Sequence, residues 1–248
     1  MSPFGRAPAD GDRLSVAGAV VRLKVNARAR RVSLRLDRTR REVVAVAPSK
    51  RRLPEAAAFA RERADWIAAR LAELPAPWLL APGMALEVFG EACRLETTAG
   101  RARWTPASAD QPARILAAGE GDVFAMGVVR VIKRRALEVF TARTLAHAAA
   151  LGQPAPKVSV MDAKARWGSC KADPRGGPGA IRYSWRLALA PLPVAEYVVV
   201  HECAHLLEQN HGPQFWAHVR RLGGDERPHR QWLRAEGARL HAFGQSGG

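Results

Sequence analysis

The residues most able to do chemistry lie in one short stretch, VVVHECAHLLEQNHGPQFW, at 198–216. Within it, His201, Glu202 and His205 form the pattern His-Glu-x-x-His. On a helix, residues four positions apart lie on one face, so both imidazoles can bind one metal ion. Glu202 lies about 100° around the helix from His201, where it can take a proton from metal-bound water without being a ligand. Imidazole ligands suit zinc, which lowers the pKa of its bound water to about 7.

A third ligand is expected, because a catalytic zinc ion usually has three protein ligands and one open position. His211 is favoured, since it follows His201 at the spacing found in His-Glu-x-x-His-x-x-Gly-x-x-His proteases. This chain has Glu208 at the glycine position, so its turn must be made differently, and Asn210 tolerates the left-handed backbone that a turn can need. Glu208 is the alternative third ligand. A purely structural role for the two helical histidines is disfavoured, because a buried imidazole pair beside a carboxylate is costly without a metal.

The composition is that of a globular protein, with 48% apolar and 25% charged residues in 248. No apolar run reaches the length of a membrane helix, and the N-terminus lacks a secretory pattern, so we expect no membrane partner. Three cysteines without a Cys-x-x-Cys pair favour a reducing, cytoplasmic location. The formal charge of +16 favours polyanionic partners such as nucleic acid, nucleotides or acidic proteins, although biased composition alone would also produce it.

The elements that must position these residues form an α+β pattern. Strand patterns or a hairpin occur at 20–25, 31–36, 42–47, 86–96 and 114–118, with one helix predicted at 54–74. Farther along, we expect a helix at 128–152, strands at 156–171 and 180–189, and a helix starting near Pro191 and Pro193 that holds the histidines.

The predicted organisation is a β-rich N-terminal region followed by a mixed region that carries the histidine helix. Residues 1–13 are predicted to be a flexible lead-in, and residues 243–248 a flexible tail. Between them, residues 14–120 form the β-rich region, which contains one helix, and residues 121–242 form the catalytic region. No internal repeat is evident.

Several segments together resemble one known family. The segments are RWGSC at 166–170, YSWRLALAP at 183–191, YVVVHECAHL at 197–206 and NHGPQFW at 210–216, with weaker likeness at 27–37, 64–74 and 88–96. In order and spacing they resemble the YgjP-like metallopeptidase family, which is related to the SprT-like zinc proteases. The common family form has Leu and Ser where this chain has Cys203 and Gly212.

The resemblance implies a zinc-dependent hydrolase with a zincin-like active-site helix. It implies that zinc is held by His201, His205 and His211, and that Glu202 is the general base. Arg166 and Trp167 are candidates for contacts with substrate or with an oxyanion. The alternative for Trp167 is a buried residue at the end of a strand.

Three functions fit these observations. The first is a zinc metallopeptidase that hydrolyses peptide or protein substrates through a Glu-activated, zinc-bound water. The second is a metal-dependent hydrolase of nucleotide phosphoanhydrides, a nucleoside triphosphate pyrophosphatase, which the charge and some family labels suggest; the chain lacks a phosphate-binding glycine loop. The third, by analogy with the SprT-like relatives, is a nucleic-acid-associated protease that acts on DNA-bound proteins, since residues 28–52 include ten Lys and Arg. The sequence indicates no particular oligomeric state.

Overall fold

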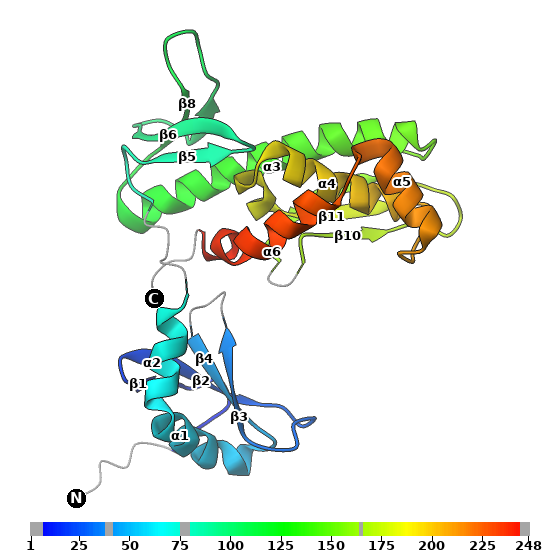
Figure 1. The fold of residues 1–248 in the computed structure, drawn as a ribbon. Coiled ribbons are helices and arrows are strands. Elements are labelled where there is room, and N and C mark those ends of the chain that lie inside the picture. Colours follow the sequence, from blue (N-terminus) through cyan, green and yellow to red (C-terminus); the bar gives the residue numbers. More distant parts are fainter. Residues whose placement is uncertain (1–6, 38–41, 75–79, 164–165, 244–248) are drawn as a thin grey trace, which may run out of the picture. The chain divides into compact units, whose positions relative to one another are not determined.

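The fold is mixed α+β, as predicted. The computed structural model describes residues 7–37, 42–74, 80–163 and 166–243 (Figure 1). The chain forms two compact units, residues 1–76 and 77–248. The boundary predicted between the β-rich region and the catalytic region, at 120 and 121, falls inside the second unit. Glu120 is the N-cap of a long helix there. The strands before that helix and the helix itself share one hydrophobic core, so they belong to one unit.

The first unit is a four-stranded sheet covered by two helices. The strands are β1 (Arg13–Val16), β2 (Ala19–Val25), β3 (Ser33–Asp37) and β4 (Glu42–Ala47), in the order β1-β2-β4-β3. A short 3-10 turn, η1 (Lys50–Arg52), leads into α1 (Leu53–Glu62) and α2 (Ala64–Ala72). Val21, Leu23 and Val43 of the sheet pack against Leu53 and Ile67 of the helices.

The single helix predicted at 54–74 is wrong, because the structure has two helices that meet at Arg63. The backbone of Arg63 leaves the helical region, with φ −105° and ψ 26°. The break lets Ile67 of α2 reach the core that Leu53 and Ala60 of α1 occupy. Nothing in the local pattern marks the break, since Arg is a good helix former.

The second unit has two sheets on a long helix. The first sheet contains β5 (Ala85–Val88), β6 (Glu91–Thr97), β7 (Arg103–Thr105) and β8 (Ala113–Ala117), in the order β5-β6-β8-β7. The second contains β9 (Lys157–Met161), β10 (Gly168–Lys171) and β11 (Ala180–Ser184), in the order β10-β11-β9. The remaining elements are α3 (Gly121–Ala150), the 3-10 helix η2 (Trp185–Leu189), α4 (Leu192–Ala204), α5 (Pro213–Gly223) and α6 (Arg227–Ala242).

Helix α3 is the common support of this unit, since it contacts β7 and β8, β9, η2 and α4 (Figure 1). It starts at Gly121, earlier than the predicted 128. The predicted strand at 156–171 is two strands, and the strand predicted at 180–189 ends at Ser184, where η2 begins. Among the described residues, no helix combines the length and apolar content needed to cross a membrane.

The two four-stranded sheets repeat one topology, which inspection of the sequence missed. In each, an antiparallel hairpin is followed by a parallel and then an antiparallel pairing. Both hairpins turn through two residues with positive φ, Ala17 and Gly18 in the first and Phe89 and Gly90 in the second. The two hairpins also share the pattern Leu-x-Val-x-Gly-x-x-x-Arg-Leu, at 14–23 and 86–95, so the sequence does carry a signal of the repeat.

Candidate metal centre

Helix α4 places the His-Glu-x-x-His pattern on a rigid, mostly buried support. Pro191 is the N-cap of the helix and Pro193 lies in its first turn, and the helix ends with His205 as the C-cap. Val199 and Cys203 face the main core of the unit, whereas Val200 and Ala204 pack against Phe215 of α5. The apolar residues before and between the histidines therefore hold the helix in place, and the face that carries the histidines stays available to bind a metal ion.

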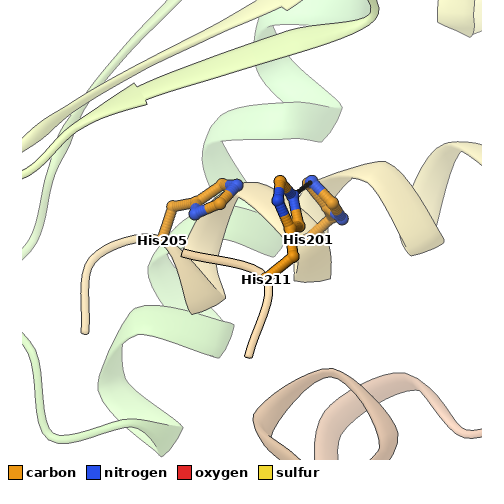
Figure 2. Close-up of side chains that lie close together, drawn as sticks. All are labelled: His201, His205 and His211. Carbon is orange, nitrogen blue, oxygen red and sulfur yellow. Dashed lines mark hydrogen bonds between the residues drawn. The ribbon is translucent and has the colours of Figure 1, made fainter. Parts of the chain in front are cut away.

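The structure brings three of the predicted histidines together. The ligand atoms of His201, His205 and His211 all lie within 4.8 Å of one another (Figure 2). The Nε2 atoms of His201 and His211 are 3.2 Å apart. Nitrogens bound at about 2.0–2.1 Å to a tetrahedral zinc ion lie about 3.3 Å from each other, so this pair fits a shared metal. Phe215 packs against all three rings, with centroid distances of 4.9, 4.6 and 4.6 Å.

The turn between α4 and α5 positions His211 without a left-handed residue. Among the described residues, Ala17 and Phe89 are the non-glycine residues with positive φ, so the expected left-handed role of Asn210 is wrong. Instead, the N–H of Glu208 donates to the carbonyl of Ala204 at 3.0 Å, and the N–H of Gly212 donates to that of Asn210 at 2.8 Å. A turn built this way does not require glycine at 208.

Hydrogen bonds orient two of the imidazoles. His205 Nδ1 lies 2.9 Å from the backbone carbonyl of Glu208, to which it can donate, and this leaves Nε2 free for a metal. His201 Nδ1 lies 3.5 Å from the Tyr197 hydroxyl, which leaves its Nε2 facing His211. Glu208 therefore contacts the cluster through its backbone, and its carboxylate is not among the clustered ligand atoms.

Burial keeps the two helical histidines neutral. It lowers the pKa of His201 to about 3, and the neighbouring His205 and His211 lower it further. Burial also lowers the pKa of His205. A neutral imidazole is the form that binds a metal ion, so both residues are ready to act as ligands at pH 7.

Glu202 is buried beside the histidines, with 6% of its surface exposed. Burial raises the pKa of Glu202 to about 7, and the positive charge of Arg166 opposes this shift. A carboxyl group with such a pKa can both accept and return a proton near neutral pH.

Gly168 of β10 makes room for Glu202. A Cβ atom at this position would lie 2.4 Å from Oε1 of Glu202 and 2.6 Å from its Cγ and Cδ. The strand therefore approaches the carboxylate as closely as it does because residue 168 has no side chain. This gives the RWGSC segment a role in confining the carboxylate.

Gly168→Ala should destabilise the protein by about 1–3 kcal/mol through this overlap. The cost should fall in a Glu202→Ala background, because that substitution removes the overlapping atoms. Urea denaturation of the four proteins in the double-mutant cycle measures both values.

Gly100→Ala is the matched control, since its Cβ would be in ordinary contact at 3.5 Å. An equal cost of Gly168→Ala in both backgrounds would show that the overlap with Glu202 is not its cause.

A cavity of about 420 Å³ opens beside these residues. It is lined by Arg166, Trp167, Gly168, Tyr197, Val198, His201, Glu202, Arg230, Leu233 and Arg234. Arg166 is exposed and lies at the wall of the cavity. Trp167 is half-buried and stacks on His241 of α6 with ring centroids 4.4 Å apart, so it is both a wall of the cavity and a packing residue.

A family model for the YgjP-like metallopeptidase domain matches residues 30–236. The chain belongs to the YgjP-like family. The match confirms the resemblance drawn from the sequence motifs and makes this chain a member of a metallopeptidase family. No curated protein and no solved structure gives a significant match. The YgjP-like match spans parts of both compact units, and its C-terminal part contains all three clustered histidines.

Several residues of the site were not among those predicted from the sequence of this YgjP-like chain. They are Gly168, Tyr197, Arg230 and Arg234, which come from β10, α4 and α6. Gly168 and Tyr197 lie inside segments that carry the family resemblance, so their position there is the signal that could have found them. The two arginines of α6 have no such signal, because α6 contains other arginines that do not line the cavity.

Proposed function

We propose that this protein is a zinc-dependent peptidase with a zincin-like active site, in which His201, His205 and His211 hold the metal and Glu202 is the general base. The single observation that carries the proposal is the cluster of three imidazoles beside a buried glutamate. Zinc suits three imidazole ligands better than magnesium or calcium, which prefer oxygen. The proposed compartment is the cytoplasm, supported by the free thiols of Cys93, Cys170 and Cys203.

When bound, zinc would supply a Lewis acid that lowers the pKa of a coordinated water and polarises the peptide carbonyl. The Glu202 carboxylate accepts a proton from the attacking water and returns it to the nitrogen of the leaving amine. Gly168 and the burial of Glu202 hold the carboxylate beside His201. Arg166, which interacts electrostatically with Glu202, adds positive charge where the oxyanion develops.

The test compares peptides with nucleotides, because hydrolysis of phosphoanhydrides is the alternative reaction. Metal-loaded protein is incubated with an unfolded protein, a peptide library and nucleoside triphosphates, in parallel with the Glu202→Gln variant. We expect cleavage of peptides that depends on Glu202. Hydrolysis of triphosphates that depends on Glu202, without cleavage of any peptide, would overturn the proposal.

A second role, association with nucleic acid, is supported by the first compact unit. Residues 1–76 contain 17 Lys and Arg against 8 Asp and Glu. A cavity of about 360 Å³ on this unit is lined by Arg31, Phe59, Arg63 and Trp66, among others. Trp66 is 38% exposed, and the Arg63 guanidinium lies over the ring of Phe59 at 5.6 Å. An exposed tryptophan ring beside arginines suits the stacking of single-stranded bases.

Trp66→Ala should weaken binding of a fluorescent single-stranded oligonucleotide about 5- to 100-fold, by loss of base stacking. Anisotropy titrations at several salt concentrations measure this, and binding should weaken with rising salt. Arg70→Gln on the same helix is the control for general charge loss, because Arg70 pairs with Glu73 at 2.6 Å. Binding that neither salt nor Trp66→Ala weakens would contradict this role.

A further inference from the structure

Three arginine side chains surround the cavity beside Glu202. Arg166 precedes β10 on one side, and Arg230 and Arg234 come from α6 on the other. Arg230 and Arg234 are four residues apart, so they lie on the same face of α6. Glu202 is the one carboxylate among the described residues that line the cavity, so the cavity carries a surplus of positive charge at the proposed reaction centre.

The charges of these three arginines are not neutralised within the part of the chain that the structure describes. There, neither Arg166, Arg230 nor Arg234 forms an ion pair with a carboxylate. Their neighbours differ: Arg220 pairs with Glu226 at 3.4 Å and Arg227 with Asp225 at 2.9 Å. Three arginines that line one cavity without a carboxylate in ion-pair distance are suited to an anionic group of a ligand.

Arg230 is held close to the histidine cluster. It is half-buried, and its guanidinium lies over the ring of Trp216 at 5.2 Å. The same Trp216 ring lies 5.9 Å from that of His211 and 6.2 Å from that of His201. The positive charge of Arg230 also acts on His201 electrostatically. A group bound by Arg230 would therefore lie next to a bond that is cleaved at the metal.

The walls of the cavity favour part of a peptide as the ligand. Trp167, Val198 and Leu233 provide apolar surface between the arginines. A glutamate or aspartate side chain joins a carboxylate to methylene groups, and it would match both the charged and the apolar parts of this lining.

We infer that this cavity is a substrate subsite for a carboxylate, with Arg230 and Arg234 as specificity-determining residues. The carboxylate belongs either to an acidic side chain next to the scissile peptide bond or to the C-terminus of the substrate. The inference rests on the proposed peptidase function and adds a substrate class to it. Peptides that place a carboxylate in this cavity are thus the preferred substrates.

The test uses peptides that differ by a single charge. A cleaved peptide from the library is remade with Glu or Gln on each side of the scissile bond, and with a free or an amidated C-terminus. For metal-loaded wild type, kcat/KM for one charged peptide should exceed that of its neutral counterpart by about tenfold or more. A Glu-over-Gln preference assigns the subsite to a side chain, and a preference for the free C-terminus assigns it to the chain end.

Variants connect this preference to the arginines. Arg230→Gln and Arg234→Gln should each bring the ratio of kcat/KM for the charged and neutral peptides close to one. Arg234→Glu should reverse the preference toward a peptide with Lys at that position. Arg221→Gln is the matched control, since Arg221 is exposed on α5 and does not line the cavity, and it should keep the wild-type ratio.

The outcomes separate this inference from the proposed function. Glu202-dependent cleavage of all matched peptides at equal rates would overturn the inference and keep the peptidase proposal. A charge preference that survives in both arginine variants would also overturn it. Absence of any Glu202-dependent peptide cleavage would overturn both, and triphosphate hydrolysis lost in Arg230→Gln would assign the cavity to phosphate.

Discussion

Glu202→Gln should lower kcat for peptide hydrolysis by about 10²- to 10⁴-fold while the bound metal is retained. The amide has nearly the same size as the carboxylate, so packing against Gly168 is kept. It cannot accept the proton of the attacking water, and the loss should therefore appear in kcat. Steady-state kinetics on a cleaved peptide, with metal content measured on the same samples, check this expectation.

Glu208→Gln is the control for this substitution. Glu208 is also close to the histidines, but its contact with His205 is made by its backbone carbonyl. This variant should retain both metal and turnover. Full activity of Glu202→Gln would show that Glu202 is not the general base.

His211→Ala should weaken zinc binding by at least about 100-fold, because it removes one of three ligands. Loss of a hydrogen-bond partner of a metal ligand already lowers metal affinity about 10- to 100-fold, and loss of the ligand itself should cost more. His211 is exposed and follows α4 in a turn, so its loss should leave the fold intact. Competition titration with a chelating zinc indicator measures the affinity, and circular dichroism verifies the fold.

This substitution also decides between the two candidates for the third ligand. The clustered atoms are those of His201, His205 and His211, which supports the histidine. If Glu208→Gln lost zinc and His211→Ala retained it, Glu208 would be the third ligand.

The centre could be predicted largely from the sequence because its geometry is local. The spacing of His201 and His205 needs only a regular helix, and α4 supplies it. His211 is only six residues after His205, and its imidazole lies beside those of His201 and His205. The turn itself was not predicted correctly, because the conformations of residues 208–210 depend on hydrogen bonds to the end of α4.

The surroundings of the centre could not be predicted, because they come from distant segments. The closeness of Gly168 to Glu202 depends on how β10 packs against α4. The positions of Arg230 and Arg234 depend on the packing of α6 against α4. Such contacts leave no periodic signal in either segment, whereas local patterns predicted β2, β4, β6 and α4 well.

Short or edge elements were also missed. Strands β1 and β7 have four and three residues and each pairs with one neighbour, so their patterns are too short to identify. The division between the two compact units falls at residues 76 and 77, away from the boundary predicted at 120 and 121.

The most direct test of the central claim is X-ray absorption at the zinc edge on the purified, metal-loaded protein, together with its metal content. We predict one zinc ion per chain, bound by three imidazole nitrogens at about 2.0–2.1 Å, with one of these nitrogens absent in His211→Ala. Zinc that binds with an unchanged ligand set in His211→Ala, or a wild-type protein that binds no zinc, would contradict the assignment of this cluster as the catalytic metal centre.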